Sequence, residues 1–241
     1  MTTFPKYLGI IMDGNRRWAA NRGLSLVSGY RKGIKTLKKV VEHSNNLNVH
    51  ELTVFAFSTE NWSRKSEEID IILSLIEWYL KSEIAELVSN NISFKVVGDQ
   101  TPFSQKVKNL IQHSEKITSN NNGMKLNVAL NYGGKMDIVH AVNSLFRKFK
   151  DNNIDKIDIT ESMILEEMYT SKIKPFDLLI RTSGEQRISN FLLWHIAYSE
   201  IFFTSKLWPD FDGDDLIEAF KRYSVSERRF GSSTAKSKSI K

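Results

Sequence analysis

The chain has no cysteine and only four prolines among its 241 residues. The absence of cysteine excludes a disulfide scaffold and a thiolate metal site, and it removes any argument for secretion. The N-terminus shows no basic region followed by an apolar stretch, so we expect no signal peptide. No apolar run is long enough to span a bilayer. These absences together predict a cytoplasmic protein, which can still touch a membrane from one side.

Motifs of several other protein classes are also missing. The chain contains no GxxxxGK(S/T), which disfavours a P-loop nucleotide enzyme. No segment rich in proline, glycine and serine divides it, so we predict one catalytic domain over residues 1–231 and a basic, disordered tail over residues 232–241. The histidines show no spacing typical of metal ligands, and we interpret all five as structural or exposed: His43, His50, His113, His140 and His195.

The formal net charge of +6 favours anionic partners. Diphosphates, anionic lipids and nucleic acid all fit that charge. Binding to RNA would require a continuous basic stripe interleaved with aromatic side chains, and the sequence shows none. We therefore expect no nucleic-acid partner and look for a site that holds small anions.

Apolar runs alternate with amphipathic stretches along the chain. The runs predict strands at Tyr7–Met12, Leu52–Phe57, Ile92–Val97, Leu126–Leu130, Asp177–Arg181 and Glu200–Phe203. The stretches between and after them predict helices at Gly29–Asn45, Glu67–Ser89, Phe103–Thr118, Lys135–Lys150, Thr160–Thr170 and Gly213–Tyr223. This alternation predicts an α/β fold: a mostly parallel central sheet of about six strands, with helices on both faces.

Polar clusters follow three of the predicted strands. The first begins at Asp13 and continues through Gly14, Asn15, Arg16, Arg17 and Trp18. The second is Ser58-Thr59-Glu60-Asn61-Trp62-Ser63-Arg64, followed by a stretch over residues 65–68 that reads as a solvated hinge of a mobile lid. The third begins at Arg181 and runs to Asn190. Ligands bind beyond the carboxyl ends of strands in open α/β sheets, so the clusters predict one crevice that holds two anionic groups.

The chemistry of the first cluster indicates a phosphate site assisted by Mg²⁺. Arginine side chains and backbone N–H groups hold phosphate oxygens. A carboxylate beside them can carry a divalent cation that bridges to the same phosphate. Asp13 is the acid in this position.

The chain resembles the cis-prenyltransferase family, most closely its bacterial undecaprenyl diphosphate synthase branch. The resemblance runs from Gly9 to Gly231, and several specific motifs occur in the right order. These are Met12-Asp13-Gly14-Asn15 with Arg17-Trp18-Ala19, Ala56-Phe57-Ser58-Thr59-Glu60-Asn61-Trp62, Asn131-Tyr132-Gly133-Gly134, Arg181-Thr182-Ser183-Gly184-Glu185, Arg187 to Trp194, Trp208-Pro209-Asp210-Phe211 and Arg229-Phe230-Gly231. The resemblance implies a homodimer that condenses isopentenyl diphosphate with an allylic diphosphate and makes cis double bonds.

The resemblance also implies a role for each matching residue. Asp13 would hold Mg²⁺ and Glu200 would be a second metal-associated acid, with Asp13 and Asn61 catalytic. Gly14, Asn15, Arg16, Arg17, Trp18 and Tyr30 would surround the allylic diphosphate. Ser58, Thr59, Glu60, Trp62 and Arg64 would form a substrate-binding lid, and Arg181, Arg187, Ile188 and Ser189 would hold isopentenyl diphosphate. Because an amide is a poor base, we interpret Asn61 as a residue that orients substrate.

Departures from the family pattern fall mainly around the allylic diphosphate. Leu26 replaces an arginine and Tyr30 replaces a histidine, while Arg16 replaces a common glycine. Two further departures are Lys65 for a proline and Gln186 for a histidine. The alternatives to an active enzyme are a non-catalytic partner subunit of a prenyltransferase and a basic nucleic-acid-binding protein. The presence of Asp13, Asn61 and Glu200 argues against the first.

The apolar runs around the first two clusters suggest where a hydrocarbon product would lie. The helix from Ile69 to Ile76 and the strand from Val54 to Phe57 would wall a tunnel. The small Ala56 side chain would let a growing chain pass, which predicts a long product, undecaprenyl diphosphate.

Overall fold

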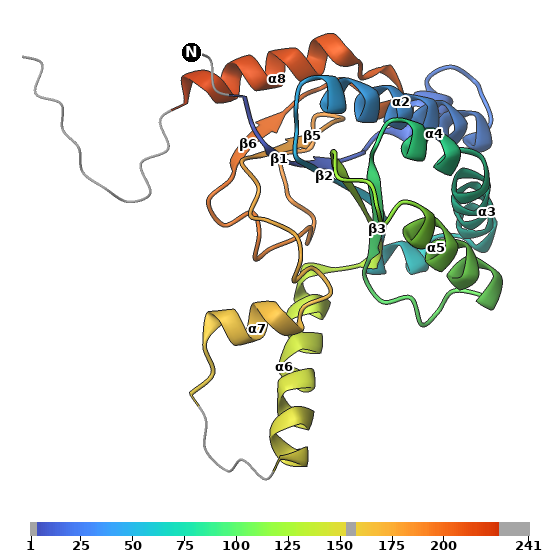
Figure 1. The fold of residues 1–241 in the computed structure, drawn as a ribbon. Helices are drawn as coiled ribbons and strands as arrows, with labels where there is room; N and C mark the ends of the chain where they lie inside the picture. The colour runs from blue at the N-terminus through green and yellow to red at the C-terminus, as the bar shows by residue number, and fades with distance from the viewer. Residues whose placement is uncertain (1–3, 153–157, 227–241) are drawn as a thin grey trace, which may run out of the picture.

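The computed structural model describes residues 4–152 and 158–226 and shows a parallel sheet of six strands (Figure 1). The order of the strands across the sheet is β3-β4-β2-β1-β5-β6. Their bounds are β1 Tyr7–Ile11, β2 Glu51–Ser58, β3 Ser93–Val97, β4 Lys125–Tyr132, β5 Leu178–Arg181 and β6 Glu200–Phe203. Every pairing in the sheet is parallel, so the predicted fold class is confirmed. The predicted domain limit at residue 231 and the basic tail lie outside the described residues.

The helices are α1 Asn15–Ala20, α2 Leu26–Asn46, α3 Ser66–Ser82, α4 Ile84–Ser89, α5 Gln105–Ile117, α6 Gly134–Asp151, α7 Glu161–Glu167 and α8 Gly213–Val225, with short 3₁₀ turns η1 Thr59–Ser63 and η2 Trp208–Asp210. The helix predicted over residues 67–89 is thus two helices, which meet at Glu83. Helix α1 was not predicted from the sequence; it begins at Asn15, within the first polar cluster.

Alternating strand residues face two separate apolar layers, as the pleat of a strand requires. Leu8 and Ile10 of β1 pack with apolar residues of α2, α3, α4, α5 and α8, whereas Ile11 faces the other layer. That second layer is formed largely by the segment 168–199, which contributes Ile173 and Phe191. The prediction of helices on both faces was therefore wrong for this face, where an irregular segment provides the covering.

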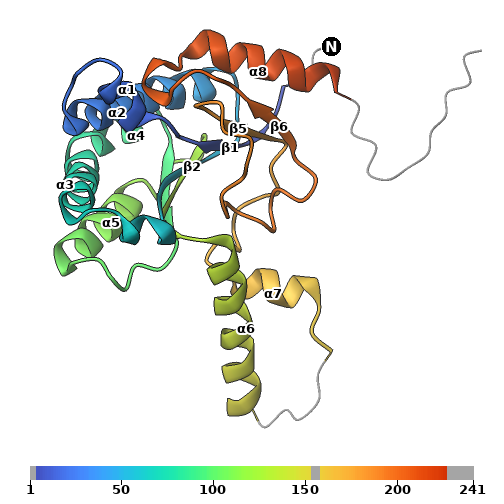
Figure 2. The same ribbon diagram turned by 180° about the vertical axis from the view of Figure 1, so that it is seen from behind.

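Helices α6 and α7 extend away from the sheet, as both views of the ribbon show (Figures 1 and 2). The fully buried Asp137 joins them to the segment that follows, because its carboxylate accepts hydrogen bonds from the Tyr169 N–H and the Thr170 hydroxyl, each at 2.7 Å. On α6, Val139, Val142 and Phe146 are 58%, 42% and 68% exposed. Their spacing places them on one side of the helix, which leaves an apolar stripe uncovered in the described chain.

His195 is only 2% exposed and packs near Phe176 in the second layer. Its ring nitrogens make no hydrogen bond of good geometry among the described residues, and the backbone of Thr170 and Ile173 provides only weaker polar contacts. Burial disfavours the imidazolium form and lowers the pKa of His195 from 6.5 to about 4. His195 is therefore a neutral part of the core, as the sequence interpretation expected of a structural histidine.

This burial predicts an acid-sensitive fold. The unfolded chain binds a proton at His195 near pH 6.5 and the folded chain does so only near pH 4, so the contribution is present above pH 6.5 and is lost as the pH falls. We expect a loss of about 3 kcal/mol of unfolding free energy across that interval. Urea unfolding of the unmodified protein and of His195→Leu at pH 7 and pH 4.5 measures it. The two proteins should differ in pH dependence, and parallel curves would show that His195 does not titrate as described.

Candidate active site

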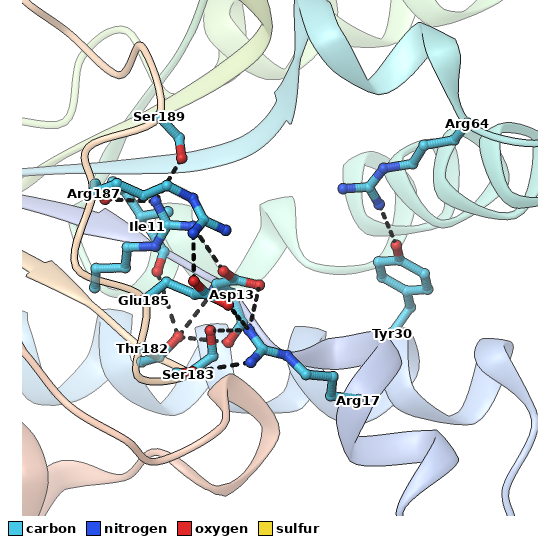
Figure 3. Close-up of polar contacts among 11 residues, drawn as sticks. Ile11, Asp13, Arg17, Tyr30, Arg64, Thr182, Ser183, Glu185, Arg187 and Ser189 are labelled. Carbon is cyan, nitrogen blue, oxygen red and sulfur yellow. Dashed lines mark hydrogen bonds and ion pairs between the residues drawn. The ribbon is translucent and has the colours of Figure 1, made fainter.

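The carboxyl ends of β1, β2 and β5 open into one cavity of about 680 Å³. All three polar clusters of the sequence contribute to its lining, as parallel strands require. Many of the predicted site residues line this cavity: Asp13, Gly14, Asn15, Arg16, Arg17, Tyr30, Ser58, Glu60, Asn61, Arg64, Arg181, Arg187 and Ser189. Figure 3 shows the polar contacts among many of them.

Asp13 lies at the centre of the polar end of this cavity. Its Oδ2 accepts a hydrogen bond of 2.8 Å from Arg181, and its Oδ1 is 3.6 Å from the guanidinium of Arg17. The Thr182 hydroxyl accepts from the backbone N–H of Asp13 and donates to its carbonyl, which fixes the chain where β1 ends. Burial alone would raise the pKa of Asp13, but the hydrogen bonds and charges of the arginines outweigh it and lower that pKa. Asp13 is therefore ionised.

Gly14 connects β1 to α1 with a φ of 115°, in the left-handed region that glycine adopts without strain. A Cβ at this position would also approach the backbone of Leu207 to 3.1 Å. This turn directs Asn15, Arg16 and Arg17 to the cavity immediately after Asp13. A side chain at this position would be strained by the φ angle and crowded by Leu207, which favours glycine.

Arg181 is almost completely buried and contacts both sides of the cavity. Its Nη1 donates to the Arg187 carbonyl at 2.5 Å and to the Ser189 hydroxyl at 2.6 Å, while its Nη2 donates to Asp13. Its Nε has no partner among the described residues. Arg181 therefore links the first and third clusters and orients the segment after β5.

Two further arginines, Arg17 and Arg187, lie closer to solvent than Arg181. Arg17 donates to the carbonyl and hydroxyl oxygens of Ser183, at 3.2 and 2.5 Å, and is 3.2 Å from Glu185. Arg187 also pairs with Glu185. Ser183 has a φ of 79° and Ser189 one of 47°, conformations rare for residues other than glycine. Such backbone outliers gather where a surrounding structure holds a binding loop in place.

The second cluster forms the 3₁₀ turn η1 at the end of β2. The Oδ1 of Asn61 accepts a hydrogen bond from the Ser58 N–H at 3.1 Å, which leaves its NH₂ group as the part that can act on a ligand. An amide held in this way donates and does not accept protons. Glu60 is tied to the third cluster by a 2.9 Å bond from Asn190.

Tyr30, Arg64 and Glu68 form a further polar group at the cavity wall. Glu68 Oε1 accepts from the Tyr30 hydroxyl at 2.8 Å and from Arg64 at 2.7 Å. Arg64 also donates to the Tyr30 oxygen (Figure 3). Burial and the nearby carboxylate raise the pKa of Tyr30 well above its usual range, although the Arg64 charge opposes this. Tyr30 thus stays protonated.

An apolar cavity of about 110 Å³ adjoins the polar one. The two share six lining residues: Met12, Asn15, Tyr30, Phe55, Ala56 and Ile72. Beyond these, the smaller cavity is lined almost entirely by hydrocarbon side chains from α2, α3 and the sheet, among them Leu37, Ile76 and Val128. A ligand with a charged head and an apolar tail would match this arrangement.

Four residues expected to bind substrate do not line either cavity. The indole N–H of Trp18 donates to Asp210 at 2.7 Å, and that of Trp62 donates to Asn131 at 2.8 Å. Thr59 hydrogen-bonds to Glu60, and Ile188 packs against the second apolar layer. In this structure these side chains support the walls, and their contact with substrate stays a prediction.

Glu200 lies far from Asp13 within one chain. It pairs with Leu178 at the amino end of the β5–β6 ladder, whereas Arg181, beside Asp13, pairs with Phe203 at the other end. Three residues of strand separate these levels, or about 10 Å. No cluster of three or more acidic or histidine ligands occurs in residues 4–152 and 158–226. The metal role of Glu200 stays a prediction.

The sequence reading missed several cavity residues. Glu68 belonged to the stretch interpreted as a solvated hinge, but it is 7% exposed and lines the cavity, so that interpretation was wrong for this residue. The available signal was the pair of opposite charges at Arg64 and Glu68, and the structure joins them at 2.7 Å although Arg64 lies before the start of α3. Met12 and Asn190 also line the cavity without a predicted binding role, whereas Ile72 belongs to the helix that was predicted to wall the tunnel.

Comparison with known proteins places the chain in a family. The family model described as "Putative undecaprenyl diphosphate synthase" matches residues 11–231, and the chain belongs to this prenyltransferase family, as its motifs predicted. Ditrans,polycis-undecaprenyl-diphosphate synthase ((2E,6E)-farnesyl-diphosphate specific) from Vibrio parahaemolyticus is 44% identical, covering 95% of this chain and 91% of that protein. The corresponding protein of Photorhabdus laumondii is 46% identical, covering 94% and 89%.

The fold is shared as well. The crystal structure of lavandulyl diphosphate synthase from Lavandula x intermedia in complex with dimethylallyl diphosphate matches this chain with a TM-score of 0.91. The sequence identity is 34%, and the match covers 95% of this chain and 99% of that one. The α/β architecture around the cavity is therefore the architecture of a prenyltransferase.

Proposed function

We propose that this chain is a Mg²⁺-dependent cis-prenyltransferase that extends farnesyl diphosphate with isopentenyl diphosphate to undecaprenyl diphosphate, a carrier lipid for cell-wall precursors. The observation that carries the proposal is the junction of two cavities: a polar one with an ionised Asp13 among arginines, and an apolar one that continues from it. The names of the two bacterial relatives support the choice of primer and product.

The residues around Asp13 fit a magnesium ion. Mg²⁺ is commonly held by one or two carboxylates together with substrate phosphates, so a single carboxylate suffices when a diphosphate supplies the remaining oxygens. The Oδ1 of Asp13 is 3.6 Å from the guanidinium of Arg17, beyond hydrogen-bond distance. Bound there, the metal would neutralise charge on the leaving diphosphate.

The arginines provide for two diphosphates. Arg16 and Arg17, beside Asp13, would hold the allylic diphosphate, and Arg187 with Ser189 would hold that of isopentenyl diphosphate, oriented through Arg181. In the reaction the allylic C–O bond breaks, a C–C bond forms to isopentenyl diphosphate, and a proton leaves the new unit. The Asn61 NH₂ group would orient the isopentenyl group, and a diphosphate oxygen would accept the proton.

The apolar cavity would hold the hydrocarbon tail. Its walls exclude water that would capture an allylic cation. Each isoprene unit adds apolar surface whose burial is worth roughly 3–4 kcal/mol, at ~0.8 kcal/mol per CH₂-sized group. A long product should therefore leave slowly and toward a lipid phase. We propose that the enzyme works in the cytoplasm and releases product at a membrane surface; no helix within the described residues is long and apolar enough to cross a membrane.

We also propose that the enzyme is a homodimer in which the apolar stripe of α6 is covered by a second copy. Phe146 is the most exposed large side chain of that stripe. Phe146→Glu should dissociate the dimer, because a charge in the contact would lack a partner. Sedimentation equilibrium measures the mass, with Lys150→Glu, on the same helix, as a control for added negative charge. An unmodified protein that sediments as a monomer would contradict the proposal. The resemblance to the family implies that the C-terminal Arg229-Phe230-Gly231 motif reaches the site of the neighbouring subunit, and this motif lies outside the described residues.

Incorporation of radiolabelled isopentenyl diphosphate tests the function directly. With farnesyl diphosphate and Mg²⁺ we expect butanol-extractable polyprenyl product, and with excess EDTA we expect none. A non-catalytic partner subunit would give no product under either condition but could stimulate a second prenyltransferase. An absence of product from the pure protein would therefore refute the proposed function.

A further inference from the structure

Glu68 is a buried carboxylate in a cavity built for anions. It lies in the first turn of α3, yet its side chain does not cap the helix and contacts three other elements. Oε1 accepts from Tyr30 of α2 and from Arg64 at the end of η1, and Oε2 is 4.0 Å from Arg16 of α1. A negative charge here would repel a diphosphate, so its presence needs a compensating role.

The position of Tyr30 indicates that role. Tyr30 lines both cavities, so it lies at the boundary between the polar end and the apolar tail site. The hydroxyl is held from the polar side by Glu68 and Arg64, and the ring packs with the main apolar cluster. Without an acceptor at Glu68, the hydroxyl would keep only Arg64, a donor, as its described partner.

Arg64 depends on the same carboxylate. Its side chain is more than one-third exposed, whereas that of Glu68 is 8% exposed. When a flexible arginine pairs with a buried acid on a helix, the fixed acid determines where the guanidinium lies. Glu68 thus fixes two groups that border the place where a diphosphate meets its hydrocarbon chain.

We propose that Glu68 is a positioning residue that holds Tyr30 at the boundary of the two cavities and thereby sets which allylic primers this enzyme uses. The inference rests on the proposed prenyltransferase function and concerns its allylic site alone. A fixed ring presents a firm wall to the isoprene units nearest the diphosphate. A ring released from Glu68 yields, so longer primers gain relative to shorter ones.

Three variants test the inference. Tyr30→Phe keeps the ring and removes the hydroxyl, Glu68→Ala removes the carboxylate that accepts from that hydroxyl, and Glu67→Gln alters the exposed neighbour in the same helical turn as a matched control. The measurement is kcat/KM for geranyl and for farnesyl diphosphate, with KM for isopentenyl diphosphate measured separately. Thermal melting confirms that each variant is folded.

We expect the first two variants to shift the farnesyl-to-geranyl ratio of kcat/KM upward by about fivefold or more, with KM for isopentenyl diphosphate within about twofold of the unmodified value. Glu67→Gln should leave the ratio unchanged. In a double variant that carries the substitutions at both Tyr30 and Glu68, the changes in the ratio should not add, because Glu68 acts through Tyr30. An unchanged ratio, additive effects or an equal shift in Glu67→Gln would overturn the inference.

Failure of this inference and failure of the proposed function give different results. If the unmodified protein does not extend either primer, the function itself is wrong. If it extends both and the variants keep the same ratio, the function stands and Glu68 does not position Tyr30. Calorimetric binding of farnesyl thiodiphosphate, which does not react readily, gives a second readout: affinity should change in Tyr30→Phe and Glu68→Ala but not in Glu67→Gln.

Discussion

Asp13→Ala is expected to abolish turnover. Asp13 is the carboxylate at the meeting point of Arg17 and Arg181, and in the proposed mechanism it alone brings the metal to the leaving diphosphate. Loss of a group that stabilises developing charge typically lowers rates by about 10²–10³-fold, and loss of a metal as well should exceed that. Initial rates of isopentenyl diphosphate incorporation over a range of Mg²⁺ concentrations measure the effect.

Two further variants separate chemistry from folding. Arg181 is buried, so removing its partner leaves a poorly compensated charge and can destabilise the fold. Asp13→Asn keeps an oxygen that can accept from Arg181 and should be nearly as inactive while melting closer to the unmodified protein. Asp99→Asn changes an acid that also follows a strand of the sheet but does not line this cavity, and should stay active. Turnover of Asp13→Asn comparable to the unmodified protein at saturating Mg²⁺ would refute the assignment.

The sheet could be predicted from the sequence because its strands carry a strong local signal. The segment from Tyr7 to Ile11 is apolar throughout since parallel strands are covered on both faces. The same pattern placed the carboxyl ends of the strands, and with them the three polar clusters. Because the carboxyl ends of parallel strands lie at one edge of the sheet, the three clusters were predicted to share one crevice. The cavity lined by Asp13, Asn61 and Arg187 confirms that prediction.

Other parts of the site depend on contacts that local sequence does not encode. The burial of Glu68 results from the approach of α1 and α2, which lie before it in the chain. Trp18 and Trp62 are residue types that often bind ligands. Each indole N–H instead donates to a side chain more than sixty residues away in the sequence, so each ring supports the structure behind the cavity. Glu200 is placed by strand register, and only its pairing with Leu178 reveals its distance from Asp13.

The wall of the proposed tunnel at β2 is another feature that local sequence does not encode, because side chains do not alternate regularly along this strand near Ala56. In a regular strand, neighbouring residues point to opposite faces. Phe55 pairs with Ala129 and Phe57 with Leu130, so Ala56 has no partner of its own on β4. A shift of this kind bends the strand and redirects its side chains. As a result Ala56 and Phe57 both pack with the apolar layer that the helices cover, whereas Phe55 packs with the other layer. Ala56 lines both the polar and the apolar cavity.

A larger side chain at Ala56 should therefore stop chain growth early. Ala56→Leu would place a branched group in the passage into the 110 Å³ apolar cavity, while the polar cavity that performs the first condensations keeps its arginines. We expect the unmodified protein to make a long product and Ala56→Leu to release shorter ones, with the rate of the first condensation reduced by less than about tenfold. Chromatography of the dephosphorylated products measures the distribution.

Ala56→Gly serves as the matched control, because it keeps the passage open at the same position and should give the full-length ladder. Thermal melting checks that leucine is accommodated without unfolding, since an added branch in a packed wall typically destabilises by about 1–3 kcal/mol. If Ala56→Leu is folded and its product ladder matches that of the unmodified protein, the growing chain does not pass this residue and the tunnel lies elsewhere. Short products from the unmodified protein would instead refute the long-chain assignment, because the passage at Ala56 would then be open without being used.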